Sequence, residues 1–322
     1  MSMKATMSYL DYVRLCTNDG NDFVYIMSLT TDGSLSGGID ELKSTVASEK
    51  VSKTGGTYLQ FLMTFESGWD FDNYPDTTSF NRALLFGFCA HNFPPGTSID
   101  IRWFAEGAST SNNANAIHHE NVTTCNDSFL HRNYPKNDFF VFENDVDLDL
   151  LADDSITAVK VTVNTTSNIE IGRLWIGNNF MIKPNTTQDQ VFDGGWNMAF
   201  QGDGEMQRND DNSAAYRDAS PIQRLISVSK SNMPFSMAYG RTEADSSDGR
   251  RNELNDTVSH MYHNVFRHDD IIVLPDYSEK SITKMTGIWG SIQNFPSIQK
   301  SNENNMYSTS IDVLEIVDEQ DT

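Results

Sequence analysis

The residues most able to do chemistry are histidines in two clusters. His118 and His119 precede Glu120, and His260 and His263 have an HxxH spacing that can share one face of a helix. Neighbouring histidines on an extended chain point to opposite sides, so the first cluster suits a solvated loop better than a metal site. The second lacks the HExxH arrangement of a zinc protease. We therefore expect no bound metal, with His260 and His263 as weak candidate ligands.

Carboxylates alternate with apolar residues at Asp145, Asp147 and Asp149. Three carboxylates on one face of a strand could bind Ca²⁺, which prefers hard oxygen ligands. An edge strand protected by charge has the same pattern, and we favour that interpretation. The sequence contains no GxSxG, Walker or Rossmann glycine motif. We therefore expect no enzymatic activity and no cofactor.

An aromatic and acidic segment at 69–74 is a candidate for contact with a ligand or a partner. Trp69 and Tyr74 could stack on a sugar, or they could pack between subunits, where aromatic residues are enriched. We favour the contact between subunits. His118 and His119 are candidates for the same two kinds of contact.

The composition of the 322-residue chain limits the classes of function. The 45 acidic residues outnumber the 23 Lys and Arg residues, which gives a net charge of -22 at pH 7. The chain therefore lacks the basic surface that nucleic-acid binding requires, and its charge disfavours an anionic membrane. No apolar run is long enough to span a bilayer, and the N-terminus has no apolar segment typical of a signal peptide. We expect a folded, soluble protein made in a cytoplasm, without nucleic-acid binding or membrane insertion.

Strands are the elements that must position these residues. Period-two alternation and short apolar runs predict strands in the first half at 58–65, 82–88, 98–104, 139–142, 156–163 and 169–177. Candidates in the second half are 198–200, 225–228, 235–239, 271–274, 285–292 and 307–316. Clusters of Asn, Pro and Gly separate many of these runs. Three tryptophans lie within strand patterns, and we expect them in the core: Trp103, Trp175 and Trp289.

Short strands at this spacing are typical of a sandwich or a barrel. We therefore expect an all-β fold of two β-sandwich or jelly-roll domains, with at most one or two short helices. A polar, proline-containing segment predicts a boundary between a first domain at 1–183 and a second β-rich, sandwich-like domain at 184–322. The segment 105–135 is expected to be a long inserted loop. An apolar stripe predicts a helix within 253–268.

Several of these elements also occur in an order that resembles a known family. The strand 58–65 is followed by HNFPPG at 91–96 and later by GRLWIG at 172–177. This order resembles the discoidin-like (galactose-binding-like) jelly roll of minor tail and baseplate proteins of tailed bacteriophages. In that family a strand ends in a His-Asn turn, and a closing strand has the second pattern. In the second half, MTGIWGSI at 285–292 and YSTSIDVLEI at 307–316 resemble the closing hairpin of such proteins.

The resemblance implies a structural component of a tailed-virus virion, made in the host cytoplasm and placed in the tail or baseplate. Such a protein would form a symmetric homo-oligomer, a ring or a trimer, and would contact other tail, hub or fibre proteins. Two alternatives stay open. One is a carbohydrate-binding module or host-receptor adhesin that holds a host-surface glycan, and the other is a β-sandwich glycan hydrolase.

Overall fold

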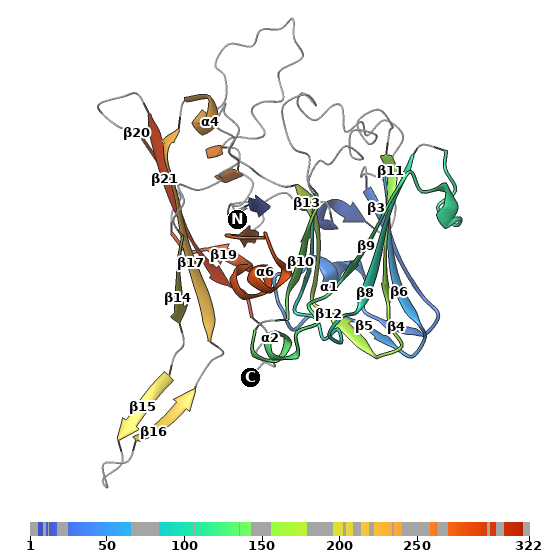
Figure 1. The fold of residues 1–322 in the computed structure, drawn as a ribbon, viewed down its shortest axis with the longest axis horizontal. Coiled ribbons are helices and arrows are strands. Elements are labelled where there is room, and N and C mark those ends of the chain that lie inside the picture. The colour runs from blue at the N-terminus through green and yellow to red at the C-terminus, as the bar shows by residue number, and fades with distance from the viewer. Residues whose placement is uncertain are drawn as a thin grey trace, which may run out of the picture.

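The structure, a computed structural model, describes most of the chain and confirms the all-β class (Figure 1). Its α-helices are short: α1 (Ile39–Lys43), α2 (Ser128–Asn133), α4 (Phe235–Tyr239) and α6 (Lys280–Thr286). Two 3-10 turns are η1 (Val13–Leu15) and η3 (Asn113–Asn115). The described residues are 6–8, 11, 13–17, 25–65, 84–105, 107–134, 136–142, 156–178, 196–201, 204–208, 214–218, 222–233, 235–239, 258–259, 261–262, 270–294, 297–300 and 306–317.

The first half is built on a six-stranded sheet with the order β2-β3-β6-β11-β8-β9. Neighbouring strands are antiparallel except for β2 and β3, which are parallel. Period-two alternation in β8 buries Ile99, Ile101 and Trp103 on one face, as the sequence predicted. The strands are β2 (Cys16–Thr17), β3 (Tyr25–Thr31), β6 (Tyr58–Phe65), β11 (Ile156–Asn164), β8 (Ser98–Ala105) and β9 (His118–Thr123).

Two three-stranded sheets share a hydrophobic core with this sheet. One has the order β10-β7-β13 and the other β12-β5-β4. Large buried side chains from all three sheets meet in that core, among them Phe61, Phe88, Trp103 and Ile171. The strands are β10 (Asp138–Val141), β7 (Leu84–Cys89), β13 (Arg173–Asn178), β12 (Ile169–Ile171), β5 (Val51–Thr54) and β4 (Ser34–Ser36). This packing of sheet on sheet is the arrangement of a β-sandwich.

A seven-stranded antiparallel sheet makes up most of the second half. Its order is β1-β18-β19-β21-β17-β14, and β20 also pairs with β21. The strands are β1 (Thr6–Ser8), β18 (Ile271–Leu274), β19 (Ile288–Ile292), β21 (Tyr307–Glu315), β17 (Gln223–Met233), β14 (Trp196–Gln201) and β20 (Ser297–Lys300). Because β1 pairs with β18, the start of the chain belongs to the sheet of the second half.

The sheet β10-β7-β13 is buried on both faces and joins the two halves. Phe86 and Phe88 of β7 face the core of the sandwich, whereas Leu85 and Cys89 face Ile272 and other side chains of the seven-stranded sheet. Trp175 and Trp289 are buried in this second core, as expected from their strand patterns. The two halves therefore share a hydrophobic core, and the expected domain boundary at residue 183 lies outside the described residues.

The opposite face of the seven-stranded sheet has a core of its own. Ile271 and Val273 of β18 alternate with residues of the shared core and pack in a cluster with Val258 and Met261. The described residues of the predicted helix 253–268, namely 258–259 and 261–262, are helical.

Two local expectations were wrong. The predicted strand 235–239 is helix α4, which follows Pro234 and in which Phe235 and Tyr239, four residues apart, pack with ring centroids 5.3 Å apart. The predicted strand 169–177 is divided at Gly172 into β12 and β13, which lie in different sheets. A Cβ at Gly172 would lie 2.9 Å from the Cβ of Ala90, so the chain needs glycine where it passes between sheets.

The segment 105–135, expected to be an inserted loop, contains strand β9 and helix α2. Strand β9 extends the six-stranded sheet by pairing with β8.

A hairpin of two strands, β15 (Gly204–Arg208) and β16 (Ala214–Asp218), connects β14 to β17. Its strands pair with each other and with no other strand of the described chain. Figure 1 shows this hairpin projecting away from both sheets. We refer to residues 204–218 as the arm.

Candidate functional site

Most of the candidate residues from the sequence lie outside the described residues. They are Trp69, Tyr74, Asp145, Asp147, Asp149, His260 and His263. His118 and His119 are described, and both lie on β9.

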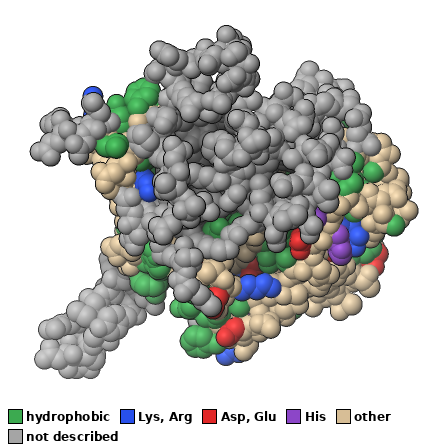
Figure 2. Space-filling model, turned by 45° about the horizontal axis from the view of Figure 1, so that its top comes forward, with side chains coloured by type: hydrophobic (Ala, Val, Ile, Leu, Met, Phe, Trp, Pro, Cys, Tyr) green, Lys and Arg blue, Asp and Glu red, His purple; other side chains and the backbone are tan. Residues whose placement is uncertain are grey.

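The side chains of His118 and His119 make separate contacts. The ring of His118 packs against Trp103, with centroids 5.0 Å apart, and its Nε2 lies 3.4 Å from Oε1 of Glu120. His119 is more exposed, and its Nε2 lies 3.0 Å from Oδ1 of Asp100. The other carboxylate oxygen, Oδ2, accepts hydrogen bonds from Arg102. In Figure 2, histidine, basic and acidic side chains lie close together on the side of the molecule that carries β8 and β9. Alternation along β9 thus separates the two rings, and the described residues contain no group of three or more metal-ligating side chains.

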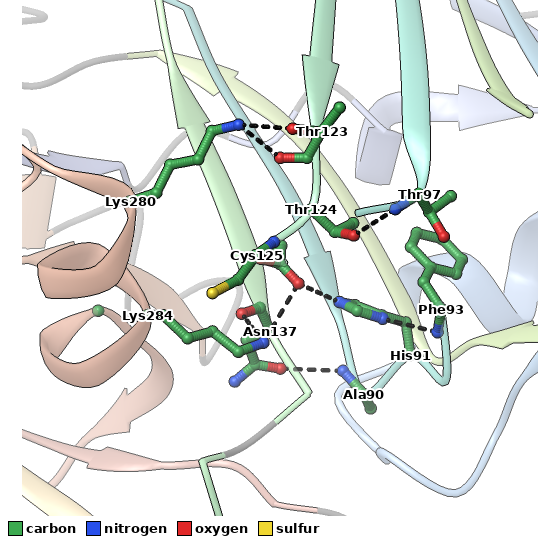
Figure 3. A network of polar contacts seen from close by, with 12 residues as sticks. Ala90, His91, Phe93, Thr97, Thr123, Thr124, Cys125, Asn137, Lys280 and Lys284 are labelled. Carbon is green, nitrogen blue, oxygen red and sulfur yellow. Dashed lines mark hydrogen bonds and ion pairs between the residues drawn. The ribbon is translucent and has the colours of Figure 1, made fainter. Parts of the chain in front are cut away.

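A buried polar cluster lies where α6 packs against β10, and the sequence analysis missed it (Figure 3). Nε2 of His91 lies 2.9 Å from Oδ2 of Asp138, and Nζ of Lys284 lies 3.2 Å from the same oxygen. The backbone N–H of Phe93 donates to Nδ1 of His91, so Nε2 carries the proton that is donated to Asp138. The backbone N–H of Cys125 donates to the other carboxylate oxygen. Every hydrogen-bonding atom of the His91–Asp138 pair therefore has a partner inside the protein.

Burial sets the protonation of this cluster. Desolvation lowers the pKa of His91 to about 4, against the opposing effect of Asp138, so the ring is neutral at pH 7. The pKa of Asp138 is lowered, although desolvation raises it, because His91 and Lys284 stabilise the carboxylate. A histidine beside a carboxylate can act as a general base. Here the side chain of His91 is 0 % exposed, so a substrate has no access to it and the cluster is structural.

A second buried cluster connects the N-terminal segment to both halves. The guanidinium of Arg173 contacts Asp11 at 2.6 Å and Asp270 at 3.2 Å, and its Nη1 donates to the carbonyl of Leu42. Asp270 also accepts a hydrogen bond from Nε1 of Trp289 at 3.0 Å. Desolvation raises the pKa of Asp11 more than Arg173 lowers it. These charges hold segments together and are closed to solvent.

A third buried pair lies within the seven-stranded sheet. Arg224 of β17 forms an ion pair with Glu315 of β21 and donates to the carbonyls of Met285 and Gly287. The guanidinium therefore joins two strands to the end of α6. All three clusters use their charges for internal contacts, and none lines an open cleft among the described residues.

The strands at the base of the arm carry exposed apolar side chains. Phe200 at the end of β14 is 67 % exposed, and Ile222 just before β17 is 65 % exposed. Strand β14 is the last strand of its sheet, and no other described strand pairs with its outer side. An open hollow of about 380 Å³ at the start of β14 is lined by Trp196, Asn197, Ser227, Val228, Ser229 and Ser310. We take the arm, β14 and this hollow as the candidate functional surface.

The sequence did not predict this surface, because no local pattern within its segments distinguishes them from ordinary exposed turns. In the sequence, GDGE at 202–205 and NDDN at 209–212 are typical of exposed turns. Only the pairing of β15 with β16 shows that the described residues between these two segments and after them form a hairpin.

No family model matches the chain, and no curated protein sequence matches it. Among solved structures, an exo-beta-agarase aligns with a TM-score of 0.31 and 12% identity, over 57% of this chain and 25% of that chain. The binding domain of botulinum neurotoxin DC, in complex with rat synaptotagmin II, aligns with a TM-score of 0.26 and 10% identity, over 97% of this chain and 94% of that chain. Likeness at this level carries no inference about function.

No helix among the described residues is long and apolar enough to cross a membrane.

Proposed function

We propose that the protein is a structural component of a tailed-virus virion that acts by assembly, with the arm as its main contact to neighbouring subunits. The observation that carries the proposal is the arm itself. A two-stranded hairpin without a third strand or a packed layer is marginally stable in water. The arm has neither among the described residues, so a neighbouring molecule is the natural source of its missing contacts.

The buried charge clusters support a rigid scaffold. Arg173, Arg224 and Lys284 each join segments that are far apart in the sequence, and each is at most 3 % exposed. The placement in a tail or baseplate is carried over from the family resemblance of the sequence.

The net charge of -22 sets how assembly should depend on salt. Subunits of one sign repel each other before they meet, and added salt screens that repulsion. We therefore expect association to strengthen as the ionic strength rises.

The test is a variant without the arm, in which residues 203–219 are replaced by a two-residue glycine linker. Native mass by light scattering should fall relative to the wild-type chain, and the melting temperature of the body should stay within a few degrees. The matched control keeps both strands of the arm and replaces residues 209–213, which lie between the paired residues Arg208 and Ala214, by Asn-Gly; it should keep the wild-type mass. Loss of the arm without any change in native mass would contradict the proposal.

Glycan binding is a second candidate, favoured by the hollow at the start of β14. An indole, an amide and three hydroxyl-bearing side chains line it, which is a suitable set for a sugar. A glycan array would test this candidate with the wild-type chain and with Ser229→Trp, which should fill the hollow. Binding that disappears in the variant would support it, and an array without signal would exclude it.

A further inference from the structure

No other strand among the described residues pairs with the outer edge of β14, and the hydrogen bonds of the neighbouring strands identify the backbone groups that point to this edge. The N–H of Gln293 donates to the carbonyl of Asp312 at 2.8 Å, and the N–H of Ile316 donates to the carbonyl of Trp289 at 2.9 Å. Even-numbered residues of β21 therefore direct their backbone groups to β19, and odd-numbered residues direct theirs to β17.

The register carries this parity across the sheet to its edge. Val313 of β21 is paired with Ile226 of β17, so even-numbered residues of β17 bond to β21 and odd-numbered residues face β14. Leu225 is paired with Ala199 of β14. Odd-numbered residues of β14 therefore bond to β17, and the even-numbered residues direct their N–H and C=O groups outward: Trp196, Met198 and Phe200.

The edge of β14 lacks the devices that normally prevent pairing with another chain. Charged residues, prolines and bulges protect most exposed edges. The segment 196–201 contains no charged residue and no proline, and its register with β17 has no shift, although 21% of the whole chain is charged. Strand β9, at the edge of the six-stranded sheet, has the same length and carries Glu120 and two histidines.

The sequence of β14 is complementary to itself in one antiparallel register. A two-fold axis perpendicular to the sheet places the same face of both copies on the same side. Residues that lie opposite each other must then both have even numbers or both have odd numbers, so the axis passes beside one residue and its own copy. An axis through Met198 places Met198 opposite its own copy and Trp196 opposite the partner's Phe200. All three outward-facing residues then form hydrogen-bonded pairs, and every free N–H and C=O group of the edge finds a partner.

We propose that two copies of the chain associate by antiparallel pairing of their β14 strands, with the two-fold axis at Met198, so that the two seven-stranded sheets become one continuous sheet. The pairing accounts for the exposure of Phe200, because each Phe200 lies across from a tryptophan of the other copy, and aromatic cross-strand pairs stabilise sheets. No like charges meet along the strand, which favours a second copy as the occupant in a chain of net charge -22.

The β14 contact rests on the proposed assembly function, and it can be tested separately from the contact made by the arm. Removal of the arm leaves β14 intact and should leave a dimer. Disruption of the β14 edge should remove the two-fold contact and leave any association made by the arm.

The main test is Phe200→Pro in the variant without the arm, followed by sedimentation equilibrium. Proline removes an N–H that points outward, so the bonds to β17 stay intact. The dimer should weaken about tenfold or more, because the two-fold axis doubles the loss of hydrogen bonds. Phe200→Lys should also weaken it, because it removes the cross-strand aromatic pair and places a charged side chain on the edge. Its matched control is Ile222→Lys, which is equally exposed but lies outside β14, and this control should not change the dimer.

The register is tested by oxidative crosslinking in a Cys16→Ser background. Met198→Cys should crosslink to its own copy, because residues opposed in a hydrogen-bonded pair lie about 5.5 Å apart at Cα, within reach of a disulfide. Gln201→Cys should not, because the two copies of residue 201 would lie about 20 Å apart along the strands. A chain without the arm that stays monomeric, a dimer that survives both substitutions of Phe200, or equal crosslinking at the two positions would overturn the proposal.

Discussion

The buried ion pair between Lys284 and Asp138 holds the second half of the chain onto the first. Lys284 lies on α6 and its side chain is 1 % exposed, whereas Asp138 lies on β10 and is 7 % exposed. The change Lys284→Met keeps most of the side-chain volume and removes the charge. It leaves a buried carboxylate whose remaining partners are His91 and the backbone N–H of Cys125. Loss of one partner from a buried pair costs about 3–5 kcal/mol.

We therefore expect Lys284→Met to lower the free energy of unfolding by about 3 kcal/mol at pH 7, the low end of that range because His91 still donates to the carboxylate. Urea unfolding followed by circular dichroism would measure this loss. Adding Asp138→Asn removes the unpaired charge and should restore part of the stability, so the two substitutions should not be additive. A loss below about 1 kcal/mol, or strict additivity in the double variant, would show that Lys284 does not stabilise the buried carboxylate.

Three further predictions concern buried residues close to where the two halves meet: His91, Gly172 and Trp289. The pKa of His91 is lowered to about 4, so on acidification the unfolded chain binds a proton before the folded chain does. The free energy of unfolding should therefore fall by about 3 kcal/mol as the pH drops from about 6.5 to 4. His91→Gln should flatten this part of the pH profile of urea midpoints. Gly172→Ala should lower the free energy of unfolding by about 1–3 kcal/mol, because a Cβ at this position would lie 2.9 Å from two other atoms. The control Gly38→Ala, whose Cβ would have its nearest contact at 3.8 Å, should leave the melting temperature almost unchanged. Trp289→Phe should cost about 1–3 kcal/mol by leaving Asp270 without its 3.0 Å hydrogen bond, and a loss smaller than 0.5 kcal/mol in urea titration would show that the bond contributes little.

Local patterns in the sequence predicted many of the strands because those strands depend on alternation alone. The bounds of 58–65 and 271–274 match β6 and β18, and the buried tryptophans were expected in the core. The pattern failed where a long-range contact decides the outcome. Gly172 divides one apolar run between two sheets, and the packing of Phe235 on Tyr239 and Tyr307 favours a helix over a strand.

The polar clusters could not be predicted from spacing at all. His91 follows β7 and Lys284 lies in α6, so the two residues are far apart in the sequence. Only the packing of the two halves brings both side chains to Asp138. The pairing of β1 with β18 joins the two ends of the chain in the same way. The place of β14 at the edge of its sheet among the described strands likewise depends on long-range pairing.

The native mass of the protein tests most directly whether it acts by assembling. Light scattering of the purified wild-type chain at low and high salt should give an oligomer whose mass rises or whose dissociation falls as salt screens the charge of -22. Removing the arm should reduce that mass to the dimer held by β14. A wild-type chain that remains a monomer at every salt and protein concentration would show that the protein does not act by self-assembly.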